Sequence, residues 1–291
     1  MRRGAAQPAR APSRRCVRLL LCASLAIPAV APARAEERAL WQLWQQHAAP
    51  PYDHAALLEA CRTYTDARPN DRLTAVSRTL AAWHLLQLGR RDDAVRIFER
   101  FAAAGADPLH NGAHTLSLAW LTRLDREKVK TALEFYYRKN VGYPRTLKDL
   151  RDFPALPAAL AFPMEDRWGL QWGYRLTGLK MITGLLDQKY ALRSQRLAAD
   201  SDLDQALALP CAARLNVAPV RVRTSTPGRE VVDFRILSPE GEDAPASGGR
   251  ESLVVSVGRT GNGIHLAYVG RALVIVNDTL HWKIMPRPGA R

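Results

Sequence analysis

Residues 36–125 place apolar side chains at the spacing of amphipathic α-helices. Leu40, Trp41 and Trp44 open the first predicted helix. The helices predicted after it span residues 56–64, 73–88, 92–105 and 112–121. Gly89 suits the C-terminal cap of the third helix, and Asn111–Gly112 indicates a turn near the start of the fifth. The pattern predicts short helices that cover one another's apolar faces.

A second pattern begins at residue 128. Ala132, Leu133, Tyr136 and Tyr137 form one face of a helix predicted over residues 128–137. Thr146 is then a plausible N-cap for a short helix at 147–150, because a threonine hydroxyl can accept from the first free N–H groups. The turn at 166–169 leads into a strand that alternates from Leu170 to Leu176.

The last third of the chain changes to the two-residue period of β-strands. The predicted strands are 189–192, 217–222, 231–237, 253–257, 264–269, 272–276 and 280–284. Residues 238–250 form a loop rich in Gly, Pro and acidic residues, and residues 286–291 are predicted to be a disordered tail. The chain is therefore predicted to be α+β, with a small antiparallel β module at residues 206–285.

Part of the helical region resembles a tetratricopeptide repeat. The residues that carry the resemblance are Trp83, Gly89, Ala94, Phe98 and Pro108. A fainter copy lies upstream at a constant offset of 39 residues and consists of Asp53, Ala55, Leu58 and Pro69. The resemblance implies a helical-repeat region over residues 36–125 whose groove binds peptides or partner proteins. The alternative is a purely structural bundle that orients the next module.

Residues 126–205 resemble the periplasmic domain of the major pseudopilin of type II secretion systems. The matching residues, in the family's order, are Ala132, Leu133, Tyr136, Gly142, Tyr143, Pro144, Asp166, Trp168, Gly169 and Tyr174. Tyr190, Leu192 and Ser194 resemble a later strand of that family. The resemblance implies a helix packed on a small antiparallel sheet, and a place in a secretion or pilus-like assembly.

Two departures from the family change this expectation. Arg167 stands where the family has a proline between Asp and Trp. The helix is preceded by residues 36–125, whereas the family's helix begins as a membrane-spanning stem. The chain is therefore not expected to enter a pseudopilus in the usual way.

The same resemblance implies one candidate metal site. An acidic loop binds calcium in the family, and Asp200, Asp202 and Asp204 follow the corresponding strand here. Oxygen ligands on alternate residues suit calcium. The family's glycines are missing, so the alternative is a solvated helix start at residues 203–207 that Asp202 caps.

The N-terminus has the features of a cleaved export signal. A basic segment precedes the apolar run 19–30, which is too short to span a bilayer, and Ala33–Ala35 forms an A-x-A cleavage site. The general secretory route is favoured over the twin-arginine route, because Arg18 stands where the twin-arginine motif has an apolar residue. The expected location is the periplasm or the exterior, with no transmembrane span after cleavage near Ala35.

Export also changes what the charge implies. Seven of the 42 basic residues lie in residues 1–35, which contain no acid, so residues 36–291 carry 35 basic and 28 acidic residues. Half of the net charge of +14 thus belongs to the predicted signal, and a nucleic-acid partner is not expected.

Candidate chemistry is sparse. Cys61 and Cys211 could form a disulfide in an oxidising compartment, and the alternative is two buried thiols. His110 and His114 have the spacing of metal ligands on a helix, but no third ligand accompanies them. The sequence contains no G-x-S-x-G elbow and no phosphate-binding glycine loop. No cofactor is predicted apart from the calcium alternative.

These patterns together predict an exported, non-catalytic protein of the cell envelope. Its expected role is protein–protein interaction, as an accessory to a type II secretion or pilus-like assembly, with an oligomeric state that the sequence does not define. The alternative is a periplasmic hydrolase or glycan-binding protein that uses a cleft near Tyr174.

Overall fold

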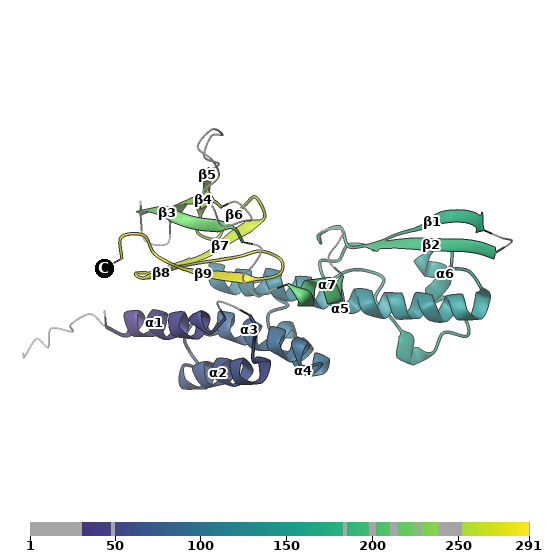
Figure 1. Cartoon of the computed structure of the whole chain (residues 1–291), viewed down its shortest axis with the longest axis horizontal. Coiled ribbons are helices and arrows are strands. Elements are labelled where there is room, and N and C mark those ends of the chain that lie inside the picture. The colour runs from purple at the N-terminus through teal and green to yellow at the C-terminus, as the bar shows by residue number, and fades with distance from the viewer. Residues whose placement is uncertain are drawn as a thin grey trace, which may run out of the picture.

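A computed structural model describes residues 31–47, 50–182, 185–197, 202–209, 215–224, 226, 229–237 and 252–290. The predicted signal peptide lies outside these residues apart from its last five. The described residues form an α+β structure with small antiparallel sheets (Figure 1). The helices are α1 (Ala31–Gln45), α2 (His54–Ala67), α3 (Thr74–Gln87), α4 (Arg91–Glu99), α5 (Pro108–Asn140), α6 (Leu147–Arg151), the 3₁₀ turn η1 (Ala158–Leu160) and α7 (Leu203–Ala208).

The strands belong to three sheets. They are β1 (Gly173–Ile182) and β2 (Leu185–Arg193), then β3 (Val217–Thr224), β4 (Glu230–Ile236) and β5 (Ser252–Ser256), and finally β6 (Thr260–Gly261), β7 (Ile264–Val269), β8 (Leu273–Asn277) and β9 (Trp282–Pro286). Each sheet pairs its strands in sequence order, β1-β2, β3-β4-β5 and β6-β7-β8-β9. All the connections are therefore between neighbouring antiparallel strands.

The predicted helix ends between α3 and α4 are confirmed. Gly89 has a φ of 73°, in the left-handed region that glycine adopts without steric cost. The N–H of Arg90 donates to the carbonyl of Leu85 at 2.8 Å, and the N–H of Gly89 donates to that of Leu86 at 3.0 Å. These bonds satisfy carbonyls that the helix end leaves free, so α3 ends where the sequence predicted.

Helix α5 corrects two predictions. The separate helices expected at 112–121 and 128–137 are one continuous helix of 33 residues, and Asn111–Gly112 lies inside it. Asp107 caps the helix and Pro108 begins it, a position where a proline loses no hydrogen bond. Gly112 has another role. An added Cβ there would lie 2.6 Å from Oδ1 of Asn277 and 2.9 Å from the ring of Trp282.

The C-terminal strands form two layers above the helices. On β8, Leu273 and Ile275 pack among the residues of α1–α5, whereas Val274 and Val276 pack against the sheet β3-β4-β5. Because successive side chains of a strand point to opposite faces, β8 is buried on both sides. We call α1–α4, the first half of α5 and β3–β9 the body (left in Figure 1).

Hydrogen bonds join the sheet β6-β7-β8-β9, which we call the central sheet, to the helices. The indole N–H of Trp282 donates to Oγ1 of Thr79 at 2.7 Å, and that of Trp120 donates to the carbonyl of Leu280 at 3.2 Å. The side-chain amide of Asn277 donates to the carbonyl of Gly112 at 3.2 Å. The close approach of the sheet therefore depends on the missing side chain of Gly112.

Glu37 anchors α1 to the far end of the chain. Its buried carboxylate accepts hydrogen bonds from the hydroxyl of Tyr268 at 3.0 Å and from the backbone N–H groups of Arg271, Ala272 and Leu273 at 3.1, 2.7 and 3.1 Å. Burial and the neighbouring Glu37 raise the pKa of Tyr268, so its hydroxyl remains a donor. One carboxylate thus closes the β7–β8 turn onto the N-terminal helix.

The second half of α5 carries a separate lobe, which we call the head (right in Figure 1). Its core contains residues of α5, α6 and β2 together with Trp172, which precedes β1, and consists of Val129, Ala132, Leu133, Leu147, Leu150, Trp172 and Leu192. The chain then returns to the body through α7, where Gln87 donates a side-chain N–H to the carbonyl of Leu207 at 2.6 Å. The head is therefore an excursion between two segments that both pack in the body.

The end of the chain is more ordered than the predicted tail. Pro286 belongs to β9, the N–H of Arg287 donates to the carbonyl of Ala272 at 2.7 Å, and its guanidinium donates to that of Gly270 at 2.6 Å. Among the described helices, none combines the length and apolar character that crossing a membrane requires.

We expect Gly112→Ala to destabilise the protein, although alanine is the better helix former by about 1 kcal/mol. The added methyl group must displace Asn277 and Trp282, at a cost of about 1–3 kcal/mol. Thermal unfolding checks this against Thr131→Ala, an exposed position on the same helix where the change removes only a local hydroxyl bond to the carbonyl of Glu127. A higher midpoint for Gly112→Ala than for the parent would contradict the close packing.

We expect Glu37→Gln to lower the free energy of unfolding by about 2–3 kcal/mol, because an amide has one acceptor oxygen for four donors and adds N–H groups that face them. Urea unfolding measures the loss. Glu59→Gln, an exposed change of the same chemistry on α2, is the matched control. Equal free energies of unfolding for the two variants would contradict the role of Glu37 as an anchor of α1.

Candidate functional sites

Five of the ten pseudopilin-like motif residues lie in the core of the head or pack against it, namely Ala132, Leu133, Tyr136, Tyr143 and Tyr174. The hydroxyl of Tyr174 donates to the carbonyl of Pro144 at 2.7 Å. The ring of Tyr143 lies 4.7 Å from that of Tyr190, centre to centre, and Tyr136 packs on the same cluster. Burial raises the pKa of Tyr174. These aromatic side chains hold the head together, and the hydroxyl of Tyr174 is engaged rather than presented to a ligand.

Asp166 organises the turn that re-enters the sheet. Its Oδ1 accepts from the N–H groups of Trp168 at 2.9 Å and Leu170 at 3.1 Å, while its Oδ2 accepts from the hydroxyl of Ser194 at 2.7 Å. Gly169 completes the turn with a φ of 73°. The tight turn predicted at residues 166–169 is present, and it ties the start of β1 to the end of β2.

Arg167 stands where the pseudopilin pattern has a proline, and the structure shows what the arginine contacts. Its Nε pairs with the carboxylate of Asp125 on α5, and its backbone N–H donates to Oγ1 of Thr122 at 3.3 Å. A proline here would provide neither contact. Asp125 is buried, and its carboxylate is paired with this guanidinium and with Nζ of Lys128, which lies 2.9 Å from Oδ1.

The predicted calcium ligands are only partly described. Asp200 lies outside the described residues. The carboxylate of Asp202 pairs with the guanidinium of Arg126 and lies 3.5 Å from Nζ of Lys130. Asp202 precedes α7, the helix of the alternative prediction, but its side chain caps no N–H there. A calcium ion would have to displace two cations, and this pairing favours a structural role for Asp202.

His110 and His114, which have the spacing of metal ligands, do not face each other in the structure. His110 donates to the carbonyl of Ala103 at 3.1 Å, and His114 donates to that of Phe101 at 2.7 Å. Each imidazole thus closes the turn between α4 and α5 instead of facing its neighbour.

A cavity of about 180 Å³ lies at residues that include Trp168 and His265, and it is smaller than the roughly 300 Å³ of typical ligand pockets.

The repeat-like residues lie in the body. Trp83, Ala94 and Phe98 are buried in one apolar cluster, and Pro108 is the first residue of α5. The helices α2, α3 and α4 therefore pack as adjacent pairs. Membership of the tetratricopeptide family stays a prediction.

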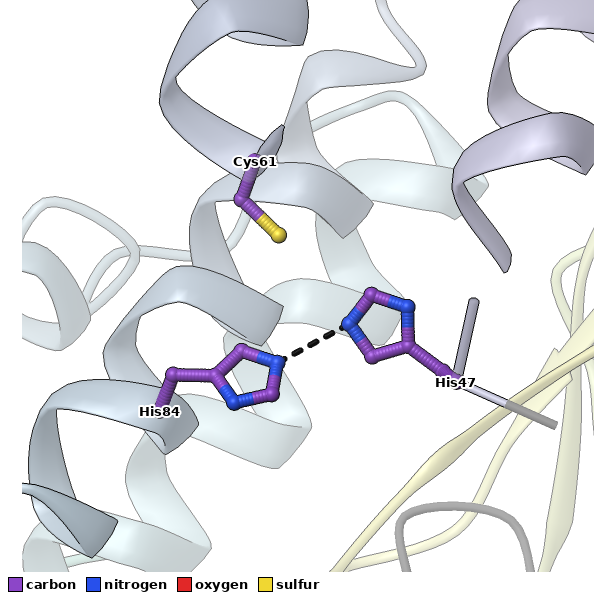
Figure 2. A group of neighbouring side chains, drawn as sticks. All are labelled: His47, Cys61 and His84. Carbon is purple, nitrogen blue, oxygen red and sulfur yellow. Dashed lines mark hydrogen bonds between the residues drawn. The ribbon is translucent and has the colours of Figure 1, made fainter. Parts of the chain in front are cut away.

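The structure brings together four residues that no local spacing in the sequence marks as a group. His47 follows α1, His54 and Cys61 lie on α2, and His84 lies on α3. His47, Cys61 and His84 are each 0% exposed, and their ligand atoms lie within 4.8 Å of one another. Figure 2 shows the two imidazoles facing each other, with the sulfur directed toward the space beside them.

The hydrogen bonds fix the tautomers of the three imidazoles. Nδ1 of His47 lies 2.9 Å from the carbonyl of Leu43, which can only accept, so this nitrogen carries the proton. Nε2 of His47 must then accept from Nε2 of His84, 2.9 Å away. Nδ1 of His84 in turn accepts from Nδ1 of His54, at 3.0 Å. The imidazoles form a directional chain that ends on a backbone carbonyl.

The surroundings of this chain are apolar and aromatic. The ring of Trp44 stacks 6.0 Å from that of His47, and the ring of Trp83 lies 5.0 Å from that of His84. Burial lowers the pKa of His84 to about 3, assisted by the other two imidazoles, and burial likewise lowers the pKa of His47. Burial raises the pKa of the Cys61 thiol to about 12. The cluster is therefore uncharged at neutral pH.

Cys61 is a buried free thiol, and Cys211, its partner in the disulfide alternative, lies outside the described residues. One weak signal for the cluster of His47, His54, Cys61 and His84 is present in the sequence. His84 interrupts the apolar run at residues 80–86 beside Trp83, and three of the seven histidines of the chain lie between residues 47 and 84. These residues come together only when α1, α2 and α3 pack, so their sequence spacing does not identify the cluster.

Comparison of the chain with protein-family models gave no match, and comparison with curated proteins and with solved structures gave none either. The functional argument therefore depends on the residues themselves.

We expect Asp166→Ala to destabilise the head by about 2–4 kcal/mol, because it leaves the Ser194 hydroxyl and two backbone N–H groups without their acceptor. Asp166→Asn should cost less, since its oxygen keeps the N–H groups and the Ser194 hydroxyl can rotate to accept. Hydrogen exchange at β1 and β2 measures the effect. Similar protection in both variants and in the parent would contradict this role.

Proposed function

We propose that this chain is an exported, non-catalytic interaction protein of the cell envelope, an accessory to a type II secretion or pilus-like assembly. The observation that carries the proposal is Val141, an apolar residue at the tip of α5 whose side chain is 74% exposed and whose φ is 56°. This residue is unfavourable in two independent ways, and contact with a partner would account for both.

The backbone of Val141 is in the left-handed region, which a β-branched side chain rarely enters. Helices usually place glycine or asparagine at this position, because the conformation costs other residues about 1–2 kcal/mol. Strain of this kind concentrates at functional positions. The neighbouring Gly142 could have served as the cap, yet the chain places the valine first.

The position of Val141 supports an interaction role. Helix α5 has 33 residues, which corresponds to about 50 Å at 1.5 Å per residue. Its first half is fixed in the body and its second half carries the head, so its last residue lies far from the body (Figure 1). A rigid helix thus presents an exposed apolar side chain at one extremity of an elongated molecule.

The class of partner follows from the resemblance of the head and from the predicted export signal. The head keeps the pseudopilin-like order of helix, turn and antiparallel ribbon, while the body occupies the place of the membrane stem. A chain of this design can contact an envelope assembly through its head without joining a filament by its stem. The partner is therefore expected to be a secretion or pilus component.

We expect Val141→Gly to reduce capture of the partner about tenfold or more while leaving the fold intact. Burying a valine contributes about 1.5–3 kcal/mol to binding, and glycine relieves the left-handed strain. The measurement is affinity purification of the tagged full chain from envelopes after mild cross-linking, followed by mass spectrometry. Thermal unfolding confirms that the variant is at least as stable as the parent.

Val254→Thr is the matched control, because Val254 is also an exposed valine, 54% exposed, but lies on β5 of the body. It should leave capture unchanged. Recovery of no secretion or pilus component with the parent chain would refute the proposed function. Equal capture by the parent and by Val141→Gly would refute the role of the tip.

A further inference from the structure

We propose that His47, Cys61 and His84 form a binding site for a zinc ion, with Nε2 of each imidazole and the sulfur of the cysteine as ligands. The site lies in the body, away from the head, and extends beyond the proposed interaction function. It uses the one group of three or more potential ligands found among the described residues.

The geometry requires only small movements. Zinc bound tetrahedrally at about 2.05 Å to nitrogen and 2.3 Å to sulfur places its ligand atoms about 3.3–3.6 Å apart. The two Nε2 atoms are 2.9 Å apart, and all three ligand atoms lie within 4.8 Å of one another. Zinc binding would move the two Nε2 atoms apart by about 0.5 Å, bring the sulfur closer by up to about 1.2 Å, and replace the proton shared by the two imidazoles with the metal (Figure 2).

The groups around the ligands suit a metal. Metal-binding histidines usually donate their second N–H to a carbonyl or another acceptor, which holds the ring in place. His47 already donates from Nδ1 to the carbonyl of Leu43, which leaves Nε2 unprotonated. His84 can reverse its tautomer and donate from Nδ1 to Nδ1 of His54, at 3.0 Å. Both imidazoles then have an unprotonated Nε2, and the sulfur lies beside these two nitrogens.

The proton balance is simple. The imidazoles are neutral before and after binding, since reversal of the chain moves the His84 proton from Nε2 to Nδ1 and the His54 proton from Nδ1 to Nε2. The Cys61 thiol loses its proton when the zinc–sulfur bond forms. Binding therefore releases about one proton per zinc ion and leaves a charge of +1 at the site.

The ligand set selects the metal. A thiolate and two imidazoles match the preferences of zinc, whereas calcium and magnesium require oxygen ligands. The described residues supply three ligands, so a water molecule or an exogenous group completes the tetrahedron. Because the ligands come from α1's C-terminal extension, α2 and α3, the ion would cross-link the start of the body.

The test uses the full chain with Cys16→Ser, Cys22→Ser and Cys211→Ser, so that Cys61 is the one remaining thiol. Cobalt(II), a spectroscopic substitute for zinc, should give a thiolate charge-transfer band and the intense visible bands of tetrahedral coordination. Zinc should displace cobalt with loss of both. Zinc at about 100 times its dissociation constant should raise the unfolding midpoint by about 5–10 °C, and a chelator should reverse the shift.

Variants assign the ligands. Cys61→Ser should abolish the charge-transfer band, and His84→Gln should abolish tetrahedral binding. His54→Leu, which removes the acceptor for His84, should weaken binding about 10–100-fold without removing it. His110→Gln, on α5 and bonded to a backbone carbonyl, is the control and should bind like the parent. Far-UV circular dichroism checks the fold of each.

Absence of a thiolate band in the parent, or a zinc-independent unfolding midpoint, would overturn the site. A band that persists in His84→Gln would overturn the assigned ligand set. If Cys61→Ser does not fold, the cobalt spectrum of the parent with Cys61 as its one thiol still tests the site. Any thiolate charge-transfer band in that spectrum must come from Cys61.

Discussion

The structure depends on one helix that belongs to two cores. The first half of α5 packs with α1–α4 and the central sheet, and the second half forms the floor of the head. Because an α-helix is rigid over this length, it sets both the separation and the orientation of the two lobes. Gly112 allows the sheet to approach the first half, and the pair of Arg167 with Asp125 attaches the head near the midpoint.

Local sequence signals were sufficient where local physics decides the structure. Gly89 ends α3 by its left-handed backbone, and Thr146 and Asp149 form the reciprocal cap that starts α6. The same reasoning failed at Gly112, where glycine indicated a turn. Its purpose is a contact with strands that lie more than 150 residues later, and no window of sequence around it contains that information.

The candidate sites show the same division. The turn at Asp166 was predictable because the groups that donate hydrogen bonds to its carboxylate lie within a few residues, apart from Ser194. The chain of imidazoles was not, because it requires the end of α1 to reach α2 and α3. Glu37 is similar, because it lies beyond the first turn of α1 where no local signal marks it, and its four donors come from the opposite end of the chain.

The two proposals concern opposite ends of the molecule and need no communication between them. A metal bound at His47, Cys61 and His84 would stabilise the helices on which the first half of α5 rests. Its effect on the head is indirect, because a firmer body fixes the direction of α5 while the side chain at its tip is unchanged. Loss of metal should therefore alter stability before it alters recognition, whereas a change at Val141 should do the reverse. The distinction follows from a helix that transmits position and not conformational change.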